Sequence, residues 1–241
     1  MANHDSAAGI VRIVVADDQP LMRQAVSSFF DAEPGHTVIG TAQNGREAVR
    51  VVAELRPDLV LMDLDMPEMN GVEATAAIVA AGGRTKVVVL TTFSIMDWIA
   101  PALRAGASGY LVKDAAPDEL VNAVQRVMAD ETVLAPAVTQ LLVAEVADSA
   151  AAERASVSVR PPLGDLTERE SQVVNLLAGG LSNKEIAEEM HLSLGSVKLH
   201  IGKASDRLGA RDRVQLLVRA IELDLVRPTL LRPETAWDRY R

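Results

Sequence analysis

The stretch Leu59-Val-Leu-Met-Asp63-Leu-Asp-Met-Pro67-Glu-Met-Asn-Gly71 decides how the N-terminal half of the chain folds. It begins with four apolar residues, becomes polar at Asp63, and reaches Pro67 and Gly71 before the next amphipathic segment. A short apolar run without alternation is typical of a strand that is buried on both faces of a parallel sheet. We therefore expect Asp63 at the carboxyl end of such a strand.

The same pattern continues on both sides of this stretch, between Ile10 and Met128. Short β-branched runs predict strands at Ile10–Ala16, Thr37–Thr41, Leu59–Met62, Lys86–Thr91 and Ser108–Val112. Amphipathic stretches predict helices at Leu21–Phe30, Gly45–Leu55, Gly71–Ala80, Ile95–Arg104 and Pro117–Met128. Strands and helices that alternate in this way predict a doubly wound α/β domain over residues 10–128, with a five-stranded parallel sheet.

The chain changes character after Met128. Residues 129–162 are rich in Ala and Ser and end in two prolines, so we interpret them as a linker, with one possible helix at Val138–Val146. Residues 163–226 are predicted to form four short helices, and capping-box patterns mark two of the helix starts, at Thr167 with Glu170 and at Ser182 with Glu185. The tails, residues 1–9 and 227–241, are assigned no structure.

Charge is distributed unevenly along the chain. The net charge is −9, but residues 1–162 hold 12 basic and 21 acidic side chains, whereas residues 163–241 hold 12 of each. Within residues 194–213, five basic side chains outnumber two acidic ones. The excess acid therefore lies in the N-terminal part, and the C-terminal part carries a modest basic stripe of the kind that phosphate contacts require, or else a solvated helix face.

Composition excludes several kinds of chemistry. The chain has no Cys, which excludes disulfides and cysteine nucleophiles, and its four His are too scattered for a transition-metal site. No secretion signal and no long apolar run is present, so we expect a soluble, cytoplasmic protein with no membrane partner.

Polar side chains stand where the predicted strands end. Asp17 and Asp18 follow the first strand, Asp63 the third and Lys113 the fifth, and Thr91 ends the fourth. The carboxyl ends of parallel strands meet at one edge of the sheet, so these groups are expected to make a site for Mg²⁺ and a phosphoryl group, with Asp63 as the nucleophile. Alone, an acidic pair could be a turn, and similar pairs serve haloacid-dehalogenase-type phosphatases, so the residues leave an enzyme open.

Four segments together resemble the receiver domain of bacterial response regulators, with its flavodoxin-like fold. They are Val-Val-Ala-Asp17-Asp18-Gln-Pro, Leu-Met-Asp63-Leu-Asp-Met-Pro67-Glu-Met-Asn-Gly71, Leu-Thr91-Thr and Gly-Tyr110-Leu-Val-Lys113-Asp. The resemblance implies that Asp63 accepts a phosphoryl group from a sensor histidine kinase. It also implies that Asp18 binds Mg²⁺ directly, Asp17 binds it through water, and the Asp65 backbone carbonyl completes the ligands.

The same resemblance implies a conformational switch. Thr91 and Lys113 would hold the phosphoryl group, and Tyr110 would turn inward as Thr91 moves. The alternative is that Tyr110 is an ordinary half-buried strand residue. The acidic side chain of Asp65 is unusual beside such a site, and it would alter the rate of phosphorylation or the lifetime of the phosphate by repulsion.

The third C-terminal helix carries a buried stripe of Val197, Ile201, Ala204 and Leu208, which directs Lys198, Leu199, Gly202 and Lys203 outward or to the flanks. Leu166-Thr-Glu-Arg-Glu170, Gly180-Leu-Ser-Asn-Lys-Glu-Ile-Ala187 and Ser196-Val-Lys-Leu-His200 resemble the LuxR-type helix-turn-helix, in the arrangement of NarL/FixJ-type regulators. The resemblance implies a recognition helix at Leu194–Leu208 in which Lys198 and Leu199 read bases, and further DNA contacts from Ser182, Asn183, Ser196 and Lys203. Leu194, Leu199 and Gly202 depart from the residues that are frequent in this family, so an unusual sequence preference is expected.

The function we expect is that of a transcription regulator rather than an enzyme, apart from its own phosphotransfer and slow dephosphorylation. Its partners would be a sensor histidine kinase, double-stranded promoter DNA, RNA polymerase and, when phosphorylated, a second copy of the chain. Val214, Leu217 and Val218 are candidates for the dimer contact, although simple packing within the domain is an equal alternative. A phosphatase of the α/β class and a DNA binder with an inactive receiver remain the competing hypotheses.

Overall fold

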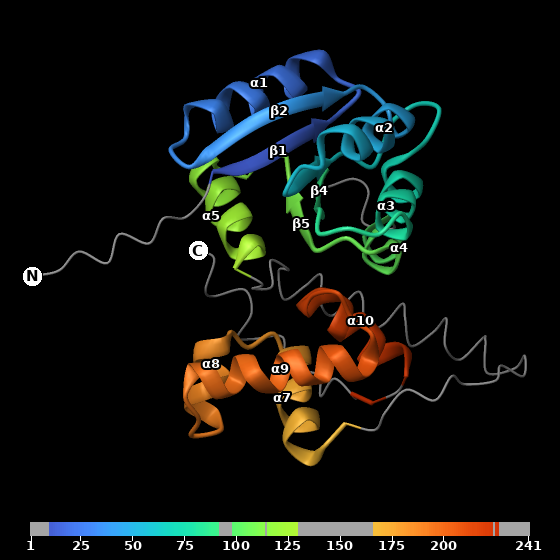
Figure 1. Cartoon of the computed structure of the whole chain (residues 1–241). Helices are drawn as coiled ribbons and strands as arrows, with labels where there is room; N and C mark the ends of the chain where they lie inside the picture. The colour runs from blue at the N-terminus through green and yellow to red at the C-terminus, as the bar shows by residue number, and fades with distance from the viewer. Residues whose placement is uncertain (1–9, 92–97, 114, 130–165, 224, 227–241) are drawn as a thin grey trace, which may run out of the picture. The chain divides into compact units, whose positions relative to one another are not determined.

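The computed structural model describes residues 10–91, 98–113, 115–129, 166–223 and 225–226. The predicted tails, most of the predicted linker and its possible helix lie outside these residues. The described chain forms an N-terminal α/β domain and a C-terminal helical domain (Figure 1). Among the helices described, none has both the length and the apolar character that crossing a membrane requires.

The N-terminal domain is built on a parallel sheet with the strand order β2-β1-β3-β4-β5. Its strands are β1 (Val11–Ala16), β2 (His36–Ala42), β3 (Leu59–Met62), β4 (Lys86–Thr91) and β5 (Gly109–Val112). The central strands are buried on both faces, as their continuous apolar sequences predict. The prediction of a doubly wound five-stranded sheet is therefore confirmed.

Helices cover both faces of this sheet (Figure 1). They are α1 (Pro20–Ala32), α2 (Gly45–Leu55), α3 (Gly71–Ala80), α4 (Ile99–Ala105) and α5 (Pro117–Met128). Val14, Val60 and Val87 of three adjacent strands pack against residues of α2 and α3 in one buried cluster. The predicted helix Ile95–Arg104 corresponds to α4, and its predicted start at Ile95 lies outside the described residues. Helix α1 begins one residue earlier than predicted because proline suits the first position of a helix.

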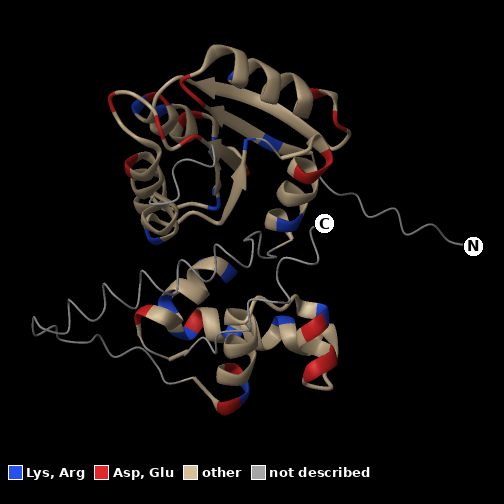
Figure 2. Cartoon of the chain, turned by 180° about the vertical axis from the view of Figure 1, so that it is seen from behind, with Lys and Arg blue, Asp and Glu red and all other residues tan. Residues whose placement is uncertain are grey.

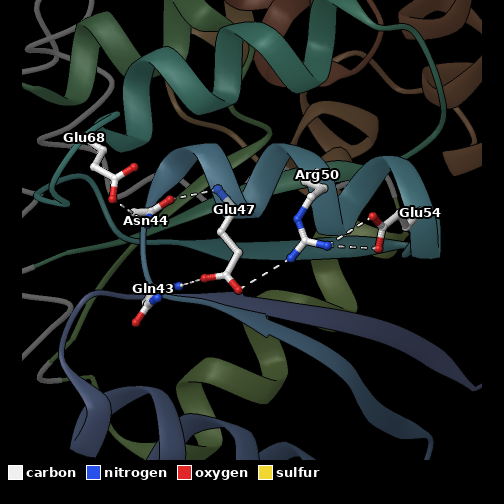
Figure 3. Close-up of polar contacts among 6 residues, drawn as sticks. All are labelled: Gln43, Asn44, Glu47, Arg50, Glu54 and Glu68. Carbon is white, nitrogen blue, oxygen red and sulfur yellow. Dashed lines mark hydrogen bonds and ion pairs between the residues drawn. The ribbon is translucent and has the colours of Figure 1, made fainter.

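Polar contacts fix the start of α2 and link it to the loop between β3 and α3 (Figure 3). Asn44 caps the helix by accepting a hydrogen bond from the Glu47 backbone N–H at 2.8 Å, and its side-chain nitrogen donates to Glu68 at 3.4 Å. Further along the helix, Arg50 pairs with Glu54 at 3.1 Å. Because Glu68 lies in the loop between β3 and α3, the Asn44 contact helps to position the loop that begins at Asp63.

Gly71 allows this loop to close tightly over the end of β3. Its backbone N–H donates to the Leu64 carbonyl at 3.0 Å. A Cβ atom at this position would lie 2.0 Å from the Asp63 carbonyl oxygen, so no other residue fits without displacing the main chain of Asp63. Gly71 thus acts directly on the geometry of the residue that the sequence identifies as the nucleophile.

The C-terminal domain consists of short helices, as predicted. These are α7 (Glu168–Ala178), α8 (Asn183–Glu189), α9 (Leu194–Leu208) and α10 (Arg213–Glu222). Both predicted capping boxes are present, at Thr167 with Glu170 and at Ser182 with Glu185. Glu170 also pairs with Arg207 of α9 at 3.1 Å, so the start of α7 is tied to the end of α9.

Candidate functional site

The main chain of the sheet sets the position of two buried aspartates. The Asp63 N–H donates to the Ala16 carbonyl at 2.8 Å, and the Asp17 N–H donates to the Ala42 carbonyl at 3.0 Å. β1 and β3 are neighbours at the point where the strand order reverses, which is where parallel sheets place ligands. Asp17 and Asp63 are only 2 % and 3 % exposed, so both carboxylates are held in an environment with little water.

Lys113, which follows β5, joins the two carboxylates. Its Nζ lies 2.7 Å from Asp17 Oδ2 and 2.8 Å from Asp63 Oδ2, and its side chain is 2 % exposed. The other oxygen of Asp63 accepts a hydrogen bond from the Leu64 N–H at 2.8 Å, and that of Asp17 accepts one from the Gln19 N–H. Each buried negative charge therefore has a cation and a backbone donor as partners.

The burial of these groups changes their ionisation. Burial raises the pKa of Asp63 above its usual value, and the hydrogen bond from Lys113 opposes that rise. Burial alone would lower the pKa of Lys113, but its bonds to Asp17 and Asp63 outweigh this and raise its pKa. Lys113 is thus held as a cation, and it stabilises the ionised form of Asp63 that a nucleophile needs.

Asp18 completes a cluster that suits a hard divalent cation. One carboxylate oxygen from each of Asp17, Asp18 and Asp63 lies within 4.8 Å of the others. The Oδ1 atom of Asp18 is buried and has no hydrogen-bond partner among the residues that the structure describes, and a buried carboxylate oxygen in this position is an expected ligand for a cation. Oxygen ligands in this number fit Mg²⁺, which keeps several of its own waters.

The other predicted receiver residues are Thr91, Tyr110 and Asp65. Thr91 ends β4, so its main chain reaches the same edge of the sheet, while its side chain is outside the described atoms. Tyr110 lies on β5 and is buried, and burial raises the pKa of its hydroxyl. Asp65 is exposed. The expected movement of Thr91 and Tyr110, and the effect of Asp65, remain predictions.

In the C-terminal domain, α9 presents the expected faces. Val197, Ala204 and Leu208 are buried, and Ile201 is partly buried. Lys198, Leu199 and Lys203 are exposed, with Leu199 at 56 %. Basic and acidic residues are interspersed along the helices of this domain (Figure 2). By sequence, α9 carries only a modest positive charge.

Three other predicted DNA contacts have structural partners. Ser182 caps α8 by accepting from the Glu185 N–H, and Ser196 makes a hydroxyl contact with Ser193 at 2.9 Å. The Asn183 side-chain oxygen accepts a hydrogen bond from Arg213. These residues therefore have roles in the fold whether or not they also reach DNA.

Arg213 is the residue that sequence reasoning missed. It is 6 % exposed at the first position of α10, and it donates to Asn183 and, at 2.6 Å, to the Leu181 carbonyl. Its place at the start of a largely apolar helix was a weak signal, and its partners are 30 and 32 residues away in the sequence. The dimerisation candidates Val214, Leu217 and Val218 are also buried on α10, which packs against α7 and α9.

Two family models match this chain. The response regulator receiver domain matches residues 13–125, and the luxR family of bacterial regulatory proteins matches residues 165–220. The first match contains the acidic cluster and Lys113, and the second contains α7, α8, α9 and most of α10.

Whole bacterial regulators are similar to the chain over most of its length. The transcriptional regulatory protein LnrK of Bacillus subtilis is 40% identical over 88% of this chain and 97% of that protein. The nitrate/nitrite response regulator protein NarL of Escherichia coli is 33% identical over 90% of this chain and 96% of that protein.

Solved structures agree with the sequence relatives. The crystal structure of a two-component response regulator of the LuxR family from Aurantimonas has a TM-score of 0.52 and 33% identity, and the match covers 57% of this chain and 98% of that one. The RcsB response regulator of Salmonella typhimurium has a TM-score of 0.51 at 21% identity, a likeness that concerns the fold alone.

Proposed function

Because this chain belongs to the two-component response regulators that join a receiver domain to a LuxR-type DNA-binding domain, we propose that phosphorylation of Asp63 controls its binding to promoter DNA. The observation that carries this proposal is the buried contact of Asp63 with Lys113 at 2.8 Å, beside Asp17 and Asp18. Family membership implies a kinase and DNA as partners. The proposal goes further in three respects: Asp63 accepts the phosphoryl group, the acidic cluster binds Mg²⁺, and the phosphorylated chain forms a dimer.

In the phosphotransfer step, an oxygen of Asp63 forms a bond to phosphorus as the phosphorus–nitrogen bond of a kinase phosphohistidine breaks and the imidazole leaves. Lys113 is positioned to pair with a phosphoryl oxygen, because its Nζ already lies at the reacting carboxylate. Thr91, at the end of β4, would donate to another phosphoryl oxygen. Hydrolysis of the acyl phosphate by water would return Asp63 to its carboxylate, which gives the slow dephosphorylation expected of this domain.

Asp17, Asp18, Asp63 and the backbone carbonyl of Asp65 would hold Mg²⁺. When bound, Mg²⁺ offsets the negative charge that gathers between the carboxylates and the phosphoryl group. The buried Oδ1 atom of Asp18 supports this assignment, since the described part of the chain supplies no donor to it. Asp17 is already engaged with Lys113 and Gln19, which favours contact through water for this residue.

The output of the switch would be DNA binding by α9, with Lys198 and Leu199 at the bases and Ser182, Asn183, Ser196 and Lys203 nearer the backbone. We propose that phosphorylation favours a dimer, whose symmetry would match paired half-sites. A dimer contact through Val214, Leu217 and Val218 would require these buried residues to become accessible. Action on promoter DNA would place the protein in the cytoplasm, where it would also meet RNA polymerase.

The test compares the wild type with Asp63→Asn, each with and without a small acyl-phosphate donor and Mg²⁺. Phosphorylation is followed by intact mass, and DNA binding is measured across promoter fragments. We expect donor-dependent phosphorylation and tighter binding in the wild type alone. Equal binding by both proteins under all conditions would show that Asp63 is not the switch, and phosphate on both proteins would show that another residue accepts it.

A further inference from the structure

The outward face of α9 carries few side chains along its centre line. Gly195, Leu199, Gly202 and Asp206 recur at helical spacing and are all exposed, and they lie opposite the buried residues Val197, Ala204 and Leu208. A Cβ atom at Gly202 would meet nothing within 4 Å, and at Gly195 it would meet only the Ser193 hydroxyl, at 3.8 Å. Over the first turns of the helix, Leu199 is thus the one side chain on this line, and it is apolar.

Neither glycine is needed for the backbone of α9. Neither adopts the left-handed conformation that favours glycine, and Gly202, in the helix interior, costs the helix up to ~1 kcal/mol relative to alanine. Among the described residues, no side chain from another helix fills the space beside them. The glycines therefore do not serve packing within the domain, and their effect is to let another molecule approach the helix closely on either side of Leu199.

We infer that this face reads the 5-methyl groups of pyrimidines in the major groove, with Leu199 as the specificity-determining residue. The inference rests on the proposed function, because it takes α9 as the helix that enters DNA. Lys198 and Lys203 flank the line with positive charge, which suits a DNA partner better than an apolar protein surface. A leucine cannot form a hydrogen bond with a base edge, and the group that it can recognise there is the methyl of thymine or of 5-methylcytosine.

Asp206 limits the length of this contact. It occupies the same line one turn beyond Gly202 and carries a negative charge that phosphates would repel. The close approach is therefore confined to the first two turns of α9, around Leu199. This chain would accordingly discriminate few base pairs by hydrogen bonds and would depend instead on where methyl groups stand in the site.

The test uses a duplex selected by the wild-type protein, treated with phosphodonor, from a random-sequence pool. Each thymine is replaced in turn by deoxyuridine, which removes only the methyl group. At the position that Leu199 contacts, each methyl is expected to strengthen binding about fourfold, the gain from burying one methylene-sized group. Cytosine and 5-methylcytosine at the same position are expected to differ by the same factor, although their hydrogen-bonding edge differs from that of thymine.

Two variants separate methyl reading from general apolar contact. Leu199→Ala is expected to bind the thymine and deoxyuridine duplexes equally. Leu194→Ala removes another exposed leucine of α9, one that lies off the outward line, and it should keep the fourfold discrimination. Discrimination that persists in Leu199→Ala, or that is absent from the wild type at every thymine, would overturn the inference while leaving sequence-specific DNA binding intact. A wild type that selects no duplex over competitor DNA would overturn the proposed function itself.

Discussion

The acidic site of the N-terminal domain and the outward face of α9 use their side chains in opposite ways. At the acidic site, Asp17, Asp63 and Lys113 are buried and hold one another by direct contacts of 2.7 and 2.8 Å. On α9, Lys198 and Leu199 are exposed, and the two glycines of the same helix border open space in the part of the chain that the structure describes. A buried charged site tolerates few residue types because each group must satisfy the others, whereas an exposed reading face is constrained mainly by the molecule it meets.

The largest effect is expected where the buried site loses its cation. Lys113→Ala leaves the Asp17 and Asp63 carboxylates facing each other without a positive charge between them, and it removes the donor placed for the phosphoryl group. Phosphorylation of Asp63 by a small donor should slow on the order of a hundredfold. Intact mass against time measures the rate. Arg50→Ala, which breaks an exposed ion pair of the same domain, should leave the rate unchanged, and an equal loss in both variants would contradict a specific role for Lys113.

The two regions are compared directly by adding one methyl group to each. Gly71→Ala forces a Cβ atom against the Asp63 carbonyl oxygen, and it should destabilise the N-terminal domain by about 1–3 kcal/mol and slow its phosphorylation. Gly202→Ala meets open space and should stabilise α9 by up to about 1 kcal/mol. Urea unfolding of the full chain measures both changes. A stable Gly71→Ala variant with normal phosphorylation would show that the β3–α3 loop can move without cost to the site.

A buried arginine offers the next largest effect. Arg213→Ala removes hydrogen bonds to Asn183 and to the Leu181 carbonyl, and it should destabilise the C-terminal domain by about 2 kcal/mol. The matched control is Arg219→Ala on the same helix, whose partly exposed pair with Glu222 should contribute no more than about 0.5 kcal/mol. Both are measured by thermal unfolding. Equal losses from the two variants would mean that burial does not distinguish these arginines.

The smallest effect is a dependence on pH. The hydrogen bond from the Thr167 backbone lowers the pKa of Glu170, with a further contribution from Arg207. The ionised carboxylate therefore stabilises the folded domain above the ordinary pKa of glutamate, and this stabilisation is lost as the pH falls through the lowered pKa. Glu170→Gln keeps a capping oxygen, so it should cost less than about 1 kcal/mol at neutral pH. As the pH is lowered to about 3, the free energy of unfolding of this variant, measured with urea, should fall less steeply than that of the wild type. An equal slope in both proteins would disprove the contribution of the Glu170 carboxylate.

The contrast between the two regions also explains what could be predicted from the sequence. The strands Leu59–Met62 and Lys86–Thr91 and the helices Gly45–Leu55 and Gly71–Ala80 are observed at their predicted bounds, because burial on two faces and clear capping residues leave strong local patterns. Asp17, Asp18, Asp63 and Lys113 were predicted to meet because parallel strands end at one edge of the sheet.

Other features depend on tertiary contacts that local patterns do not contain. The bonds from Arg213 to Asn183 and Leu181 could not be predicted, since nothing near Arg213 in sequence specifies partners about 30 residues away. The openness beside Gly195 and Gly202 likewise depends on which neighbours fail to cover α9. Sequence pattern thus predicted the acidic cluster and the exposed face of α9, while the structure supplied the contacts that tie α8 to α10.

The hydrogen bond from the Asp63 N–H to the Ala16 carbonyl has a consequence for how such a protein can vary. Both of its atoms belong to the main chain, so no substitution of a side chain removes the bond itself. The register between β1 and β3 pairs Ala16 with Met62, the residue before Asp63, and thereby holds the two acidic loops beside each other whatever apolar residues fill the strands. The strand interiors can therefore drift in sequence, or be redesigned for greater stability, while the sheet preserves the spacing between Asp17 and Asp63.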